Sequence, residues 1–265
     1  MPIWLIFLLT IAIVLIAISM IIYFIQDSII FHTEKLPANF SFSFANDFEE
    51  INLTTQDGNT LNGVLFKVEN SKGIVLFYHN HSGNIDHWSR SAIFINSYNF
   101  DVLIMDYRGF GKSTGSFNEK LMLRDSLLWY DFTRKLYEED KITVYGRGIG
   151  STFATYVASK NNPIKLVLES GFYSLSYTAK IQYPYLPTKL ILKYKFETFN
   201  YIGQVNCKIY LLHGKKDGLV HYSNSEKLHQ LKIDNCDLIL IPEGNHHNLI
   251  GNELYLKSIK EVLSS

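Results

Sequence analysis

The sequence predicts an α/β protein in which an open, mostly parallel sheet follows an N-terminal apolar helix. Beyond about residue 70, short apolar runs alternate with stretches of helical periodicity, which is typical of parallel β–α units. Before the first of these units, Asp57-Gly58 separates two strand-like runs and indicates an antiparallel hairpin. At the N-terminus, the 23 residues from Ile3 to Ile25 carry no charge.

The uncharged N-terminal run is long enough to cross a membrane. At about 1.5 Å per residue, a helix of this length spans a hydrocarbon core about 30 Å thick. A cleaved signal peptide would need a basic region before a shorter apolar stretch, whereas the first basic residue here is Lys35. We therefore expect residues 1–26 to be an uncleaved transmembrane anchor, which predicts a single-pass membrane protein. The flanking charges do not set its orientation.

The rest of the chain is long enough for one α/β domain over residues 48–265, after a connector at 27–47 with aromatic docking positions. Strands are expected at 50–55, 61–68, 73–79, 101–106, 141–145, 164–169, 208–213 and 237–241. Helices are expected at 87–98, 118–139, about 149–159, 223–231 and 252–262.

The composition excludes several classes of function. Lys and Arg together number 25, as do Asp and Glu, so the chain lacks the basic excess of a nucleic-acid-binding protein. Cys207 and Cys236 are too few for a disulfide framework, and neither lies in a metal-ligand spacing. We therefore expect no nucleic-acid partner, no metal and no cofactor.

The most informative motif is the glycine-rich turn after the strand expected at 141–145. In the pattern G-x-S-x-G, a sharp strand-to-helix turn presents a serine nucleophile. This chain has the flanking Gly146 and Gly150, but Gly148 stands where the serine would be. Because the nucleophile of such a turn has a positive φ, glycine is expected to relieve backbone strain while removing the reactive hydroxyl.

Seven segments, in order and spacing, resemble the α/β-hydrolase family and in particular its membrane-anchored, serine-aminopeptidase-like branch. They are HNHSGN (79–84), DYRGFGKSTG (106–115), GRGIGS (146–151), ESGFYSL (169–175), YPYLP (183–187), HGKKDGLV (213–220) and EGNHHN (243–248). The resemblance covers about residues 48–263. It implies the α/β-hydrolase fold with a short helical lid at about 170–205, and hydrolysis of an ester, thioester or amide by a Ser-His-Asp triad.

The resemblance also implies roles for individual residues. Asp217 matches the triad acid, His247 matches the triad base, and Gly148 occupies the nucleophile position. The backbone N–H groups of Ile149 and His81 match the oxyanion hole.

Three neighbouring residues bear on this assignment. His246 falls where the family usually has a small residue, and Asn80 replaces the usual glycine in the first loop. Ser151 lies three residues past the tip of the turn, inside the expected helix, so we do not expect it to act as the nucleophile.

The sequence therefore predicts a serine-hydrolase-fold protein that is catalytically impaired. Two alternatives stay open: an active hydrolase with a residual or altered mechanism, and a non-enzymatic, membrane-tethered binding protein. A remote alternative is a dinucleotide-binding protein, because Gly146 and Gly148 follow a strand and Glu169 ends the next one. Aromatic and basic residues crowd the segment at 170–205 beside the anchor, so the expected ligand is a small or lipid-like acyl compound.

Overall fold

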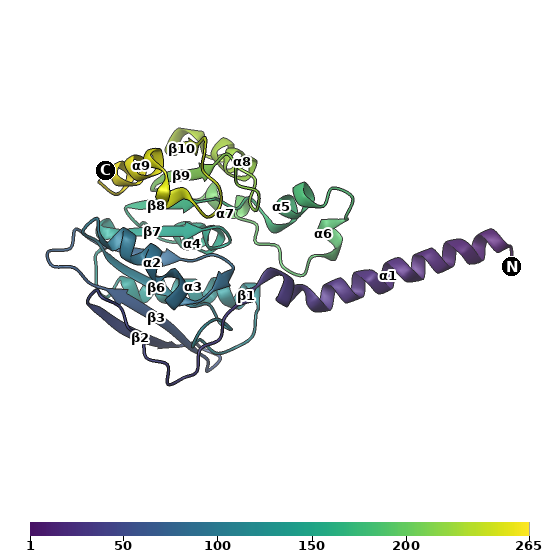
Figure 1. Cartoon of the computed structure of the whole chain (residues 1–265), viewed down its shortest axis with the longest axis horizontal. Coiled ribbons are helices and arrows are strands. Elements are labelled where there is room, and N and C mark those ends of the chain that lie inside the picture. Colours follow the sequence, from purple (N-terminus) through teal and green to yellow (C-terminus); the bar gives the residue numbers. More distant parts are fainter. Residues whose placement is uncertain (265) are drawn as a thin grey trace.

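An eight-stranded sheet lies at the centre of the α/β domain in the computed structural model, which describes residues 1–264 (Figure 1). Its strands are β2 (Phe48–Thr54), β3 (Thr60–Phe66), β4 (Ile74–Tyr78), β6 (Asp101–Met105), β7 (Ile142–Arg147), β8 (Lys165–Glu169), β9 (Lys208–Gly214) and β10 (Cys236–Ile241). Across the sheet their order is β10-β9-β8-β7-β4-β6-β3-β2. The strands from β10 to β6 are parallel, and β3 is antiparallel to both of its neighbours. The predicted fold class, a mostly parallel sheet with an antiparallel N-terminal hairpin, is confirmed.

The hairpin between β2 and β3 closes at the predicted Asp57-Gly58 turn. Thr54 pairs with Thr60 at its end, and Gly58 has a φ of +77°. The Thr55 hydroxyl donates to Asp57 Oδ1 at 2.6 Å, which fixes the turn from inside.

Five of the helices match the expected positions. They are α2 (Ile85–Asn96), α3 (Glu119–Thr133), α4 (Gly150–Ala158), α8 (Ser223–Leu231) and α9 (Glu253–Ser264). Helix α3 ends at Thr133, earlier than the expected residue 139, because the chain then folds back in tight turns onto the Thr133 carbonyl. This fold-back lets the Tyr137 hydroxyl donate to Asp101 at 2.9 Å.

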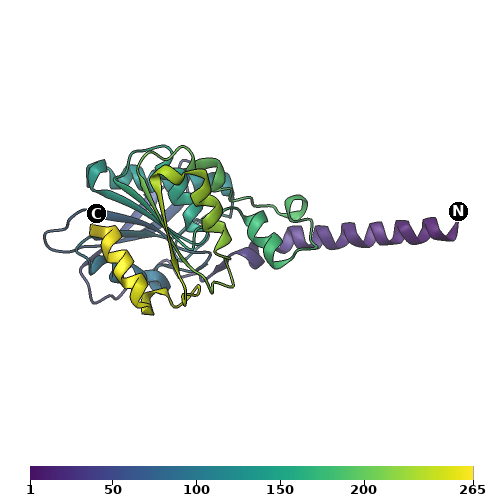
Figure 2. The ribbon, with the colours of Figure 1, turned by 90° about the horizontal axis from the view of Figure 1, so that it is seen from above.

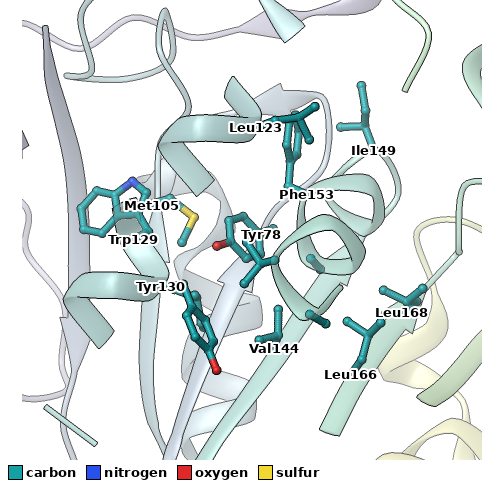
Figure 3. Packing of buried hydrophobic residues seen from close by; sticks show 14 of the residues in the cluster. Tyr78, Met105, Leu123, Trp129, Tyr130, Val144, Ile149, Phe153, Leu166 and Leu168 are labelled. Atoms are coloured by element: carbon teal, nitrogen blue, oxygen red, sulfur yellow. The ribbon is translucent and has the colours of Figure 1, made fainter. Parts of the chain in front are cut away.

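The core has two layers because alternate residues of each buried strand point to opposite faces. In β4, Leu76 and Tyr78 belong to the cluster that packs against α3 and α4, whereas Val75 and Phe77 belong to the cluster that packs against α2 and α9. Figure 3 shows the first cluster, in which Trp129, together with Tyr78, fills the space between α3 and the sheet. The sheet, buried on both faces, is a rigid base for the loops at the carboxyl ends of its strands.

Helix α1 (Ile3–Ile30) projects away from the domain as a straight rod (Figures 1 and 2). It is long and apolar enough to cross a membrane, and its apolar residues are exposed along most of its length. The helix continues past the expected end of the anchor at residue 26, because the buried Gln26 accepts a hydrogen bond from the Lys193 N–H at 2.7 Å and donates to the Ile191 carbonyl at 2.7 Å.

The segment after α1 docks on the domain at once. Phe31 is buried and its ring stacks on Phe117, with the ring centroids 4.4 Å apart. The two-residue strand β1 (His32–Thr33) then pairs in parallel with β5 (Ser82–Gly83). A pair this short leaves no periodicity in the sequence, so it was not among the predicted elements.

The expected lid segment lies between β8 and β9 and contains three short helices. These are α5 (Leu175–Gln182), α6 (Thr188–Ile191) and α7 (Phe199–Ile202). Helix α6 lies against α1 (Figures 1 and 2). The aromatic residues of the segment divide into two groups, since Tyr194 and Phe196 are buried in the core whereas Tyr183 and Tyr185 are exposed.

Candidate active site

The glycine-rich turn joins β7 directly to α4, and each of its glycines is required by the local packing. Gly148, at the tip, has a φ of +54°. A Cβ at Gly146 would lie 2.7 Å from the Ala154 Cβ, and a Cβ at Gly150 would lie 2.1 Å from the Tyr78 carbonyl oxygen. The flanking glycines therefore allow the strand and helix to meet closely enough for a sharp turn, and Gly148 occupies its tip.

A buried carboxylate and a histidine face this tip from the loops after β9 and β10. His246 Nδ1 lies 2.8 Å from Asp217 Oδ2, which also accepts a hydrogen bond from the Ser170 hydroxyl at 2.9 Å. Asp217 Oδ1 accepts hydrogen bonds from the backbone N–H groups of Leu219 and Val220 at 2.9 and 2.8 Å. The carboxylate is thus held on both oxygens and orients the imidazole of His246.

The charge state of Asp217 follows from this environment. Burial would raise its pKa, but hydrogen bonds from His213 and His246 outweigh burial and hold the pKa of Asp217 well below its usual range. The carboxylate is therefore ionised at neutral pH and can only accept. It follows that His246 carries its proton on Nδ1 and turns the lone pair of Nε2 toward Asn80 Nδ2.

The histidine in this pair corrects the sequence prediction, which placed the base at His247. The His247 side chain is exposed, and its backbone N–H donates to Asn245 Oδ1 at 2.8 Å. The Asn248 side chain in turn accepts from the Asn245 N–H at 2.7 Å. This tight turn points the two adjacent rings in different directions, so only His246 reaches Asp217. In the sequence, the resemblance favours His247, because His246 falls where the family usually has a small residue.

The two backbone donors expected to form the oxyanion hole converge on one atom. The N–H of His81 donates to Asn80 Oδ1 at 2.8 Å, and the N–H of Ile149 donates to the same oxygen at 3.3 Å. The expected pair of donors is therefore brought together, but around a side-chain oxygen of the protein itself.

Asn80 is the residue of this site whose importance sequence reasoning missed. Its Nδ2 lies 2.7 Å from His246 Nε2, so the carboxamide bridges the histidine and the two backbone donors. A Cβ built on Gly148 would lie 2.3 Å from Asn80 Oδ1 and 2.5 Å from its Cγ. Asn80 and His246 are each only 3% exposed. The one signal in the sequence was an asparagine where the family usually has glycine.

Comparisons with known proteins agree with this architecture. A hydrolase family model described as serine aminopeptidase matches residues 69–199. An uncharacterized protein of Mycobacterium tuberculosis is 25% identical over 263 residues, which cover 96% of this chain and 94% of that protein. An uncharacterized membrane protein of Saccharomyces cerevisiae is 28% identical over 225 residues, covering 82% and 79% of the two chains. The solved structure of an esterase from Pyrococcus furiosus superimposes with a TM-score of 0.69 at 19% identity, covering 89% of this chain and 96% of that one.

The chain has the α/β-hydrolase fold, and a hydrolase family model matches its central part. In this fold, Arg147 braces the histidine loop. Its Nη2 donates to the His246 carbonyl at 2.6 Å, and its Nε lies 3.2 Å from Glu169. Glu169 also accepts hydrogen bonds from the hydroxyls of Tyr145 and Tyr255, so both of its oxygens have partners inside the protein.

His81 adds a second imidazole to the hydrolase site. Its Nδ1 lies 2.9 Å from Asn80 Oδ1, and its ring meets His32 edge-on with 5.6 Å between the centroids. Burial, together with the nearby His246 and His32, lowers the pKa of His81 to about 4. The ring is therefore neutral at physiological pH and donates from Nδ1 to Asn80.

Ser151 and the two cysteines are buried or partly buried and have structural surroundings. The Ser151 hydroxyl is buried, donates to the Gly148 carbonyl at 2.6 Å and accepts from the Phe172 N–H at 2.9 Å. Burial raises the pKa of both Cys207 and Cys236 to about 12. In the part of the chain that the structure describes, no cluster of three or more His, Cys, Asp or Glu side chains is arranged to hold a metal ion.

Proposed function

We propose that this protein is a membrane-tethered α/β-hydrolase that has lost serine nucleophilic catalysis and is therefore catalytically impaired. The observation that carries the proposal is the tip of the turn. Gly148 has the left-handed backbone of a nucleophile and faces the Asp217–His246 pair, but it has no side-chain atom that could attack a substrate.

The reaction of the family explains what is lost. A serine oxygen attacks the acyl carbon, histidine takes the proton, aspartate fixes the histidine tautomer, and two N–H groups stabilise the oxyanion. Asp217, His246 and both N–H groups are present here, whereas the covalent step has no atom to perform it. Removal of one member of such a triad leaves a residual effect of about 10³–10⁴-fold over water.

A mechanism in which His246 activates water has weaker support than loss of activity. Such a mechanism needs the free lone pair of His246 Nε2 beside the acyl carbon. In the structure, Asn80 Nδ2 donates to this nitrogen at 2.7 Å. The proposed ligand class remains that of the family, an acyl compound, and a groove lined by Tyr177, Leu186 and Phe199 of the lid segment fits its apolar part.

The membrane tether is proposed from α1 and the lid segment together. In α6, Leu190 and Ile191 lie against the face of α1 between Leu15 and Phe24, within the uncharged run. Leu190 is 86% exposed and Tyr185 is 98% exposed. With α1 in a bilayer, Leu190 lies beside the domain-proximal part of the span, where its exposed side chain can contact lipid.

Covalent labelling tests the proposed loss of the nucleophile. The purified full-length protein in detergent is treated with a fluorophosphonate probe, with an active serine hydrolase in the same tube as positive control. We expect the control to be labelled and this chain to stay unlabelled. Labelling that disappears in His246→Ala would contradict the proposal, and ester turnover without labelling that also needs His246 would favour the altered-mechanism alternative.

A further inference from the structure

We propose that Asn80 is an internal ligand of the hydrolase site, in which its carboxamide replaces both the serine hydroxyl and the substrate carbonyl. The inference rests on the proposed function, since it identifies what fills the site that the serine left. Asn80 Oδ1 lies where the two backbone N–H groups of Ile149 and His81 converge, and Asn80 Nδ2 reaches His246 Nε2.

The hydrogen-bond polarities match those of a working site. In a serine hydrolase, the serine O–H donates to histidine Nε2, and the acyl oxygen accepts from the oxyanion hole. A carboxamide carries a donor and an acceptor on one carbon, so it satisfies both demands at once. Because Asp217 fixes the His246 proton on Nδ1, Nε2 can only accept, and the Asn80 NH2 group is the donor it requires.

The asparagine at position 80 leaves no space for the serine that the family usually has at position 148. A Cβ on Gly148 would lie 2.3 Å from Asn80 Oδ1, 2.5 Å from Cγ and 2.9 Å from Nδ2, and all three distances are shorter than a van der Waals contact. A side chain at 148 therefore competes with the carboxamide for the same space. The asparagine at 80 and the glycine at 148 form a matched pair, and restoring serine alone does not reopen the site.

The loop that carries Asn80 is held from both sides. The Asn80 carbonyl oxygen lies 2.7 Å from His79 Nδ1, and the Tyr107 hydroxyl donates to the His79 carbonyl at 2.7 Å. On the other side, the His32 N–H donates to the His81 carbonyl at 3.1 Å. If the carboxamide swung out, it would leave two buried backbone donors and the His246 lone pair without their partner, and this opposes opening.

Four proteins test the matched pair: the wild type, Gly148→Ser, Asn80→Gly and the double variant. Fluorophosphonate labelling rates and thermal unfolding midpoints are measured for each. We expect the double variant to label about 100-fold or more faster than Gly148→Ser, because only the double variant has a free oxyanion hole. We also expect Gly148→Ser to lower the unfolding midpoint and Asn80→Gly to restore part of that loss. Gly148→Ala combined with Asn80→Gly is the matched control, which opens the site without a nucleophile and should stay unlabelled.

The outcomes separate this inference from the proposed function. If Gly148→Ser alone labels as fast as the double variant, Asn80 does not block the site, although loss of the serine still explains the silent wild type. A folded double variant that does not label also overturns the inference. If the wild type is labelled and this labelling disappears in His246→Ala, the proposed function is overturned instead.

A second measurement covers the case in which the serine variants fold poorly. The imidazole nitrogens of the full-length protein are followed by ¹⁵N NMR in the wild type and in Asn80→Ala. We expect the Nε2 resonance of His246 to move when its amide donor is removed, while Nδ1 stays bonded to Asp217. An unchanged Nε2 resonance would show that the carboxamide does not bind the histidine in solution.

Discussion

Replacing His81 with glutamine should remove a large part of the acid sensitivity of this protein. The His81 ring faces the histidines of three other segments, His32 on β1, His79 at the end of β4 and His246 before α9, and it is largely buried. Burial and these neighbours lower its pKa from its ordinary value of 6.5 to about 4. The Gln variant keeps the backbone N–H that donates to Asn80 but has no titrating group.

The size and the sign of the effect follow from proton linkage. In the unfolded chain, histidine binds a proton below about pH 6.5, whereas folded His81 stays neutral down to about pH 4. The stability of the wild type therefore falls as the pH drops through this window, and the loss is complete below the folded pKa. Because one pH unit corresponds to about 1.4 kcal/mol, the difference between 6.5 and about 4 gives at most about 3.5 kcal/mol, and partial exposure of the ring lowers the expected loss to about 1–3 kcal/mol.

The effect is measured by urea unfolding of the full-length protein at about pH 7.0, 6.0, 5.0 and 4.5. The quantity compared is the change in the free energy of unfolding per pH unit. We expect the free energy of unfolding to fall more steeply in the wild type than in His81→Gln. His221→Gln, at an exposed position away from the site, is the matched control and should follow the wild type. If wild type and His81→Gln lose stability in parallel, His81 is not the source of the acid sensitivity and the reasoning is refuted.

Three further predictions concern the turn, a buried ion pair and the anchor. Gly148→Ala should destabilise the fold by about 2–5 kcal/mol, from about 1–2 kcal/mol for the left-handed backbone and about 1–3 kcal/mol for overlap with Asn80. In the Asn80→Ala variant, Gly148→Ala should lose the contribution from overlap and cost only the backbone contribution. If the effects of the two substitutions on the free energy of unfolding in urea simply add, this prediction is wrong. Asp125→Ala should cost about 1.5–3 kcal/mol, because Arg108, only 2% exposed, loses its partner at 2.6 Å and keeps only Asp57 at 3.0 Å; a loss below about 1 kcal/mol would argue against a buried ion pair. The full-length protein should resist alkaline carbonate extraction from membranes with its N-terminus intact by mass spectrometry, and a shortened chain would point to a cleaved signal sequence.

The order and type of the main elements could be predicted because strands buried on both faces are nearly continuous apolar runs. All five residues of β4 and all five of β6 are buried. The glycine spacing at 146–150 predicted a sharp turn for a reason visible in the structure, since a Cβ on Gly150 would lie 2.1 Å from the Tyr78 carbonyl. Spacing of this kind records a steric requirement in the sequence itself.

Features that depend on side-chain direction could not be predicted in the same way. His246 and His247 are adjacent and chemically identical, and only the turn fixed by Asn245 and Asn248 decides which of them faces Asp217. The Asn80 carboxamide enters the site because a loop from β4 and a turn from β7 meet there, which is a contact between positions 69 residues apart. No local pattern encodes such a contact.

Only Phe31 separates the end of α1 from β1, and its buried ring leaves no flexible stalk between helix and domain. Along the chain, the six residues from Gln26 to Phe31 follow the uncharged run, a length of about 10 Å in helical geometry. With α1 in a bilayer, the domain therefore stands at a fixed height and tilt just above the headgroups. The loop carrying His81 is joined to β1 by the β1–β5 pair, so it is tied directly to the end of α1.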